Sequence, residues 1–157
     1  MATSTLPPCG MYRTTLPLEN KDQQLAVPAG RLVYFHNHSE QNKPIVLLPQ
    51  AVTDNRWTFQ DRGFLVESTS WINSMVPLMA QGFYTLRQEI IPAGGGSMSA
   101  GLLVQLGYNQ NGEPILFPGS LVAGNNIHFP ERGVKVSDLQ LDLLQEAQFR
   151  LVGPASG

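Results

Sequence analysis

Residues 59–66, FQDRGFLV, return 70 positions later as residues 129–136, FPERGVKV. Both stretches place Phe, an acidic residue, Arg, Gly and Val at the same spacing. The same offset over residues 31–67 and 101–137 gives nine identities in 37 ungapped positions, whereas unrelated segments would give about two. We therefore predict that the chain is internally duplicated, with the two acid–Arg–Gly turns at equivalent places in two like halves.

Each half shows the same order of predicted elements: two strands, the acid–Arg–Gly turn, a strand, a short helix and a strand. Runs such as RLVYFHN at residues 31–37 are rich in β-branched and aromatic side chains, which favours strands, and Asn111-Gly112 is a hairpin signal. Ser68 or Ser70 can cap the first helix. Units of about 50–60 residues are marginal alone, so the halves should pack together. The predicted fold is mostly β with one short helix per half, built as a pseudo-two-fold β-barrel or β-sandwich, and the pattern leaves both open.

The predicted domain organisation has four parts. Residues 1–29 contain four prolines, so we expect an extended Pro-rich arm with no helix or central strand. Residues 30–91 form the first half, residues 92–101 a Gly-rich joint and residues 102–153 the second half, with the halves packed as one domain. The arm has no counterpart in the repeat and is the first place to look for a partner. Its candidate contact residues are Leu6, Met11, Tyr12, Leu16 and Leu18.

The composition excludes some classes of partner. Only 14% of residues are charged, which is low for a freely dispersed protein and typical of a surface that contacts other protein. A net charge of −2 and scattered cations leave no basic field for nucleic acid. No apolar run approaches the roughly 18 residues of a membrane span, and the N-terminal segment lacks the regions of a signal peptide. We expect a cytoplasmic or particle-associated protein without a membrane or nucleic-acid partner.

The two acid–Arg–Gly turns are the most specific local feature. Arg62 and Arg132 could grip a shared anion at the pseudo-two-fold, with Asp61 and Glu131 beside them, because guanidinium groups bind oxyanions through two hydrogen bonds. In the structural alternative, each Arg fastens its turn by pairing with a carboxylate or with backbone carbonyls. In that case the following Gly adopts a positive φ.

The sequence contains no convincing catalytic or cofactor site. His36 and His38 would lie on one side of a strand, a weak candidate for a metal pair, but the equivalent positions of the other half are not histidines. No nucleophile elbow and no phosphate-binding loop is present. We therefore predict no metal and no cofactor. The candidates considered for a third metal ligand are Glu40, Asp54 and His128.

The expected function is a non-enzymatic structural or assembly protein. It would be a repeated subunit of a larger particle, such as a virion decoration (cement) or tail component, and its partners would be other proteins or copies of itself. The first alternative is a small β-barrel module that binds an anionic small molecule. A third reading, a metal-dependent enzyme using the histidines, has the least support.

Overall fold

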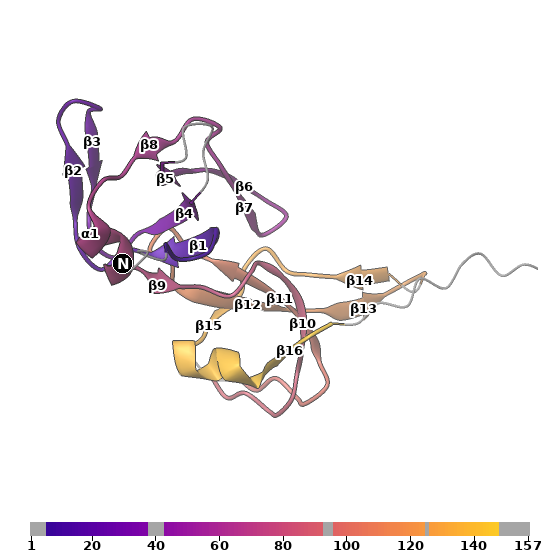
Figure 1. The fold of residues 1–157 in the computed structure, drawn as a ribbon. Helices are drawn as coiled ribbons and strands as arrows, with labels where there is room; N and C mark the ends of the chain where they lie inside the picture. The colour runs from indigo at the N-terminus through magenta and orange to yellow at the C-terminus, as the bar shows by residue number, and fades with distance from the viewer. Residues whose placement is uncertain (1–5, 38–42, 93–95, 125, 148–157) are drawn as a thin grey trace, which may run out of the picture.

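The computed structural model describes residues 6–37, 43–92, 96–124 and 126–147 (Figure 1). The described part of the chain is mostly β, with one short α-helix, α1 (Thr69–Ser74), and one short 3₁₀-helix, η1 (Asp138–Leu143). None of the helices in these ranges has the length and apolar character needed to cross a bilayer. The strands are β1 (Gly10–Arg13), β2 (Leu18–Asn20), β3 (Leu25–Val27), β4 (Leu32–His36), β5 (Ile45–Leu47), β6 (Pro49–Thr53), β7 (Arg56–Phe59), β8 (Phe64–Leu65), β9 (Val76–Pro77), β10 (Gly82–Leu86), β11 (Leu103–Tyr108), β12 (Pro114–Pro118), β13 (Ser120–Val122), β14 (Asn126–His128), β15 (Val134–Lys135) and β16 (Leu144–Glu146).

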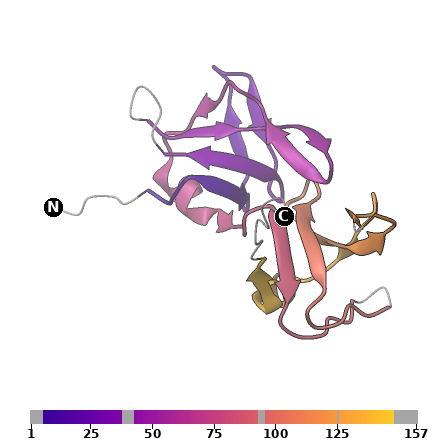
Figure 2. The same cartoon turned by 90° about the vertical axis from the view of Figure 1, so that its right-hand side faces the viewer.

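Two open five-stranded antiparallel sheets make up the body of the molecule. Their strand orders are β8-β5-β4-β1-β9 and β15-β12-β11-β10-β16. The remaining strands form three hairpins, β2–β3, β6–β7 and β13–β14. Figure 2 shows the two sheets beside one another, each with two edges. Because neither sheet closes on itself, the predicted barrel is wrong, and the sandwich remains as the alternative.

The two sheets correspond strand by strand. The pairing registers relate each residue of the first sheet to one in the second by an offset that shrinks along the chain. It is 72 in β1 and β10, 71 in β4 and β11, 70 in β5 and β12, and 69 in β9 and β16. A constant offset of 70 is therefore two residues out in β1 and one residue out in β4, where Leu32 corresponds to Leu103 and not to Leu102. Equivalent positions with identical residues include Gly10 and Gly82, Tyr12 and Tyr84, Val33 and Val104, and Ile45 and Ile115.

Equivalent residues also make equivalent hydrogen bonds. The Tyr12 hydroxyl donates to the Pro8 carbonyl at 2.6 Å, and the Tyr84 hydroxyl donates to the Ala80 carbonyl at 2.8 Å. Each helix is capped by a serine hydroxyl that accepts from the backbone N–H three residues later, as the sequence predicts for the first. The capping serines are Ser68 and Ser137.

The N-terminal segment contributes an inner strand, which corrects the expectation that none fits within residues 1–29. β1 pairs with β4 on one side and with β9 on the other. Pro7, Pro8 and Pro17 flank the paired residues and do not interrupt them, so the ladder keeps its N–H donors. Residues 18–27 then form the β2–β3 hairpin.

The Gly-rich stretch at residues 92–101 does not separate the halves. It lies between β10 and β11, which are neighbours in the second sheet. Three parts of the predicted organisation lie outside the described ranges. They are residues 93–95 of this stretch, the first residues of the arm, and the last residues of the second half with the strand expected at 149–152. The first sheet is built from residues 10–77 and the second from residues 82–146, so the halves meet near residue 80.

Two hydrophobic clusters lie on the sheets, and one of them joins the halves. The first fills one face of the first sheet, where Tyr12 and Phe35 make an edge-to-face contact with ring centroids 5.9 Å apart and Trp71 of α1 covers the strands. The second fills one face of the second sheet but also takes in Met11 and Leu32 from the opposite face of the first. That shared burial fixes the two sheets relative to one another.

Candidate functional site

The two acid–Arg–Gly turns lie at the edges of different sheets. Asp61 and Arg62 precede the edge strand β8, Glu131 and Arg132 precede the edge strand β15, and all four side chains are exposed. Within the described part of the chain, neither arginine makes a hydrogen bond or an ion pair. Anion binding by these arginines therefore stays a prediction.

The glycines of these turns are required by close packing, and the predicted positive φ is wrong for both. A Cβ at Gly63 would come within 2.8 Å of Leu47 Cδ2. A Cβ at Gly133 would overlap Ile115 Cγ2 and lie 2.7 Å from the Leu116 carbonyl oxygen. The turn therefore presses its backbone onto the neighbouring strand, β5 or β12, in both halves.

Cys9, His36 and Asn37 form a small polar cluster where β1 begins and β4 ends. The thiol donates to Asn37 Oδ1 at 3.2 Å and accepts from the Asn37 backbone N–H at 3.3 Å, while Asn37 Nδ2 donates to the Pro7 carbonyl at 2.9 Å. The Cys9 sulfur also lies 3.5 Å from His36 Nδ1. These contacts tie the segment before β1 to the end of β4.

No metal centre emerges from the described residues, among which no group of three or more His, Cys, Asp or Glu side chains gathers. His38 and Glu40, two of the considered ligands, lie outside the described ranges. Asp54 and His128 lie at the β6–β7 turn and in β14. The histidine pair therefore stays a prediction, because His38 is not among the described residues.

The β6–β7 hairpin of the first half crosses onto the second half. The Trp57 indole N–H donates to the Tyr108 carbonyl at 2.6 Å. The Trp57 backbone N–H donates to Gln81 Oε1 at 2.7 Å, and Gln81 Nε2 donates back to the Trp57 carbonyl at 3.2 Å. One glutamine side chain thus satisfies both backbone groups of Trp57, which fixes the hairpin on the second sheet.

The turn of the same hairpin reaches the outer face of the second sheet. Asn55 Nδ2 donates to Gln105 Oε1 at 3.2 Å and to the Pro130 carbonyl at 3.0 Å, and Gln105 Nε2 donates to the Asp54 carbonyl at 2.8 Å. A Cβ at Gly107 would lie 2.8 Å from the Asn55 carbonyl oxygen, so only glycine allows this approach. Gln105 is consequently buried although it carries an amide.

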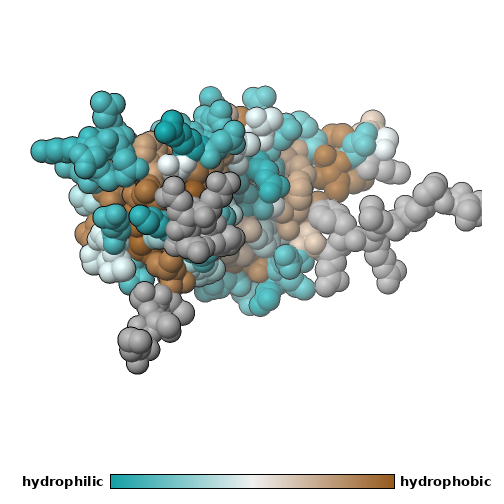
Figure 3. Space-filling model, turned by 45° about the horizontal axis from the view of Figure 1, so that its top comes forward, coloured by the Kyte–Doolittle hydropathy of each residue, from teal (hydrophilic) through white to brown (hydrophobic). Residues whose placement is uncertain are grey.

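In the equivalent hairpin of the second half, β13–β14, every residue of both strands is exposed. It projects away from the body of the molecule in Figure 1. Leu121 is 74% exposed, and its cross-strand neighbour Ile127 is 46% exposed. Figure 3 shows hydrophobic surface gathered at this end of the molecule. Leu121, Val122 and Ile127 are called the hairpin patch from here on.

A groove of about 540 Å³ separates the two hairpins. Phe83 and Phe129 form part of its wall, with ring centroids 5.2 Å apart, and Ile127 of the hairpin patch also lines it. Half of the residues that line the groove are apolar and half are polar. Its polar lining consists of Asp54, Asn55, Gln105, His128 and Glu131.

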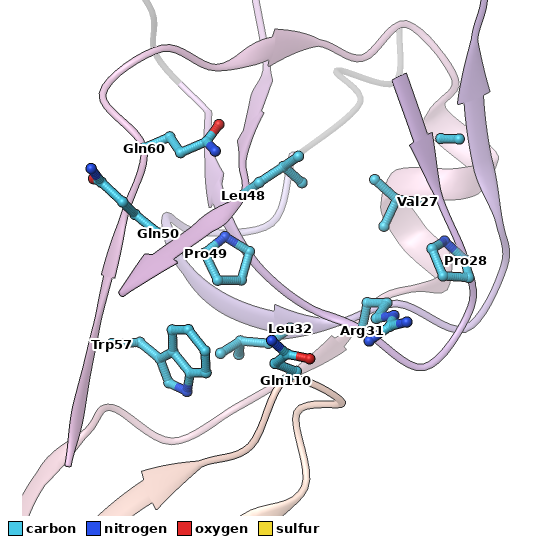
Figure 4. A pocket seen from close by; sticks show the side chains of 11 residues that line it. Val27, Pro28, Arg31, Leu32, Leu48, Pro49, Gln50, Trp57, Gln60 and Gln110 are labelled. Atoms are coloured by element: carbon cyan, nitrogen blue, oxygen red, sulfur yellow. The ribbon is translucent and has the colours of Figure 1, made fainter. Parts of the chain in front are cut away.

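A second pocket, of about 380 Å³, lies beside Trp57 at the junction of the halves (Figure 4). Leu32, Arg31 and Pro49 come from the first half, and Gln110 comes from the loop after β11. The Gln110 carbonyl also accepts from the Leu32 backbone N–H at 2.8 Å. The pocket therefore depends on both halves being in place.

The buried tyrosines of the interior keep their protons at neutral pH. Burial raises the pKa of Tyr108 far above its ordinary value, and its hydroxyl donates to the Met79 carbonyl at 2.8 Å. Burial also raises the pKa of Tyr84, with the Glu146 carboxylate adding to the effect. These phenols stay protonated and keep their hydrogen bonds to backbone carbonyls, since a raised pKa makes a phenol a weaker acid.

The predicted arm residues divide between the interior and the surface. Met11 and Tyr12 are buried in the protein's own clusters, Leu6 and Leu18 pack against the first cluster, and Leu16 is exposed. Sequence reasoning did not find the hairpin patch or the groove. A low charge and the apolar run SLV in β13 were the signals present, but neither shows which strands lack a neighbour.

Comparison of the chain with known protein families, with curated proteins and with solved structures finds no match.

Proposed function

We propose that this chain is a non-enzymatic structural subunit that assembles with other protein, in keeping with the function expected from its sequence. The hairpin patch carries the proposal. Its apolar side chains lie on a projecting two-stranded hairpin and are exposed, Leu121 the most, and contact with water is unfavourable for them. The adjoining groove extends the same surface with Phe83.

We also propose that the two halves arose by tandem duplication. The equal strand orders, matching registers and recurring tyrosine and serine hydrogen bonds support this origin. Under this proposal, contacts shared by the halves serve the scaffold. Differences between equivalent surfaces then indicate where function lies.

The test is the state of association of the protein. Light scattering after size-exclusion chromatography and electron microscopy of the native material should show the chain in an oligomer or on a larger particle. Leu121→Asp should reduce that association, because a carboxylate would have to lose its water in the contact. Leu139→Asp is the matched control, since Leu139 is 81% exposed on η1, outside the hairpin patch. A monodisperse monomer that joins no particle in its native lysate contradicts the proposal.

A second candidate function, ligand binding, is favoured by the pocket beside Trp57. The pocket presents an indole, several amides and Arg31, whose Nη1 donates to Asn111 Oδ1 at 3.3 Å. Carboxylated and phosphorylated metabolites should quench Trp57 fluorescence if this pocket binds them, and Arg31→Ala should remove the response. Unchanged fluorescence across such a panel contradicts this function.

A further inference from the structure

We propose that the pocket beside Trp57 binds a monocarboxylate with a flat apolar body. Arg31 holds the carboxylate, and the body lies against Trp57 and Pro49 (Figure 4). This binding rests on the second candidate function above, narrowed to one class of ligand, and it is independent of assembly.

The apolar part of the pocket is rigid before any ligand binds. Leu48, Pro49 and Trp57 supply its walls. The Trp57 backbone is hydrogen-bonded to Gln81, and its indole N–H is hydrogen-bonded to the Tyr108 carbonyl. A proline ring has no rotamers to lose. Little side-chain freedom is therefore lost on binding, which favours a flat and rigid ligand.

Arg31 carries the only charge among the described residues that line this pocket. Its Nη1 donates to Asn111 Oδ1 at 3.3 Å, but its Nε and Nη2 make no hydrogen bond with a described residue. In the view of Figure 4, Leu32 lies between Arg31 and Trp57, which places the charge toward one end of the pocket and the indole toward the other. Two N–H groups of one guanidinium match the two oxygens of a carboxylate.

The charged residues next to Arg31 have other partners. Arg13 and Glu113 line a neighbouring hollow that also includes Arg31. Arg13 holds Asp138 at 2.6 Å, and Glu113 contacts Lys135 at 3.4 Å. Arg31 therefore presents a single positive charge to the pocket. A phosphate group carries a charge of about −1.5 to −2 at pH 7, so one guanidinium matches a carboxylate better.

Neutral amides occupy the remaining polar positions of the pocket. Gln50, Gln60 and Gln110 line it and are exposed, and their side chains make no hydrogen bond with a described residue. An amide side chain can both donate and accept. These side chains can therefore bind a polar substituent on the apolar body, and they do not repel a carboxylate.

The backbone that carries Arg31 recurs in the second half. The Thr14 N–H donates to the Arg31 carbonyl at 2.9 Å. At the equivalent place, the Leu86 N–H donates to the Leu102 carbonyl at 3.1 Å. Leu102 packs against the second cluster, so this backbone accepts an apolar side chain. The guanidinium of Arg31 is therefore not a requirement of the shared scaffold.

The apolar wall of the pocket is also confined to the first half. Ile127 takes the place of Trp57 in the equivalent hairpin, and the offset of 70 found in β5 and β12 gives Gly119 for Pro49. Under the proposed duplication, features shared by the halves serve the scaffold. The indole, the proline ring and the guanidinium occur together in one half, which is the pattern expected of a site with its own function.

The test follows the two indole N–H signals of the chain by NMR. The probe is phenylacetate, because it joins a carboxylate to a flat ring. A ligand of this size should bind with a Kd of about 1 mM and shift the Trp57 signal until the site is saturated. Trp71 is the internal control, since it is 4% exposed in the first cluster and its indole donates to the Leu16 carbonyl. Its signal should not move.

Two analogues and two variants test the role of the charge. Phenylacetamide has the same shape without the charge and should bind at least about 10-fold more weakly, as expected when hydrogen bonds to a charged group are lost. Phenyl phosphate should also bind more weakly than phenylacetate. Arg31→Gln should weaken phenylacetate binding by the same factor and leave phenylacetamide binding unchanged.

A matched control carries the same change outside the pocket. Arg87→Gln alters an exposed arginine of the second half and should bind phenylacetate like the unchanged protein. The NMR spectrum also shows whether each variant is folded. Arg31→Leu, which matches Leu102 of the second half, replaces Arg31→Gln if that variant is not folded.

Several results overturn the proposed site. Phenylacetate that shifts both indole signals, or neither, removes the pocket as its binding place. Equal binding of phenylacetamide, or unchanged binding by Arg31→Gln, removes the role of Arg31. Tighter binding of phenyl phosphate overturns the monocarboxylate class and leaves the ligand-binding function standing. If the wider metabolite panel also leaves Trp57 fluorescence unchanged, that function is lost too, while assembly is judged separately by light scattering.

Discussion

Replacing each motif glycine by alanine should destabilise the two halves unequally. At Gly133 the new Cβ meets Ile115 Cγ2 and the Leu116 carbonyl oxygen, which belong to a strand paired on both sides. At Gly63 the close atoms are mainly the ends of the Leu47 and Ile45 side chains, at 2.8 and 2.9 Å. Side-chain ends can rotate away, but a strand carbonyl can move only with its ladder.

The expected magnitude follows from two opposing effects. Forcing an extra methyl group into a packed site costs about 1–3 kcal/mol. Alanine returns about 0.4–1 kcal/mol by restricting the unfolded chain, because neither glycine has a positive φ that alanine would resist. We expect Gly133→Ala to lower the free energy of unfolding by about 2 kcal/mol. Gly63→Ala should lower it by less than about 1 kcal/mol.

Urea unfolding followed by far-UV circular dichroism measures both changes. For a chain of this size, 1 kcal/mol corresponds to about 2–4 °C in the thermal midpoint, which offers a second readout. Double substitution should be additive, since the two turns lie on different sheets. The packing argument is refuted if Gly133→Ala proves as stable as Gly63→Ala, or if both remain within about 0.5 kcal/mol of the unchanged protein.

Three further changes probe the junction of the halves and the interior. Stability should fall as pH rises above about 10, because buried phenols with raised pKa values favour folding only while protonated. In thermal scans, Tyr108→Phe should make this fall less steep. At neutral pH the same variant should lose about 1 kcal/mol of stability with the hydrogen bond to Met79. Arg13→Ala should cost about 1 kcal/mol and lose salt sensitivity in urea unfolding, since its guanidinium holds Asp138 of the other half at 2.6 Å. Gly107→Ala should push Asn55 off the second sheet and speed amide hydrogen exchange in β6–β7, and unchanged exchange there would contradict the close approach.

Much of the strand content and both helices could be predicted from local pattern. Residues 31–37 and the segment after Ser68 behave as their side chains indicate, since β-branched runs and a capping hydroxyl act over a few residues. The equal placement of the two acid–Arg–Gly turns was also predictable. The positive φ expected for their glycines was wrong because two different requirements, a close contact with a strand and a positive φ, both select glycine in a sequence.

The correspondence between β1 and β10 was missed in the sequence for a physical reason. Gly10 and Tyr12 match Gly82 and Tyr84 only at an offset of 72, which a search at 70 does not find. Two identities in a short strand also carry little weight until pairing partners are known. The hairpin patch could not be predicted for a related reason. β6–β7 and β13–β14 look alike in sequence, and only tertiary contacts show which of them is covered.

Each sheet is built from one continuous stretch of chain, and this has a consequence during synthesis. The first sheet needs nothing beyond residue 77, so it can complete while the second is still being translated. At about 5–20 residues per second, the remaining residues take several seconds to emerge. Met11, Leu32 and Trp57 stay uncovered for that time on the nascent chain. Neighbouring ribosomes on one messenger RNA would then hold the same uncovered surface of several nascent chains close together. Slower translation of the second half would lengthen the time in which these surfaces can associate wrongly.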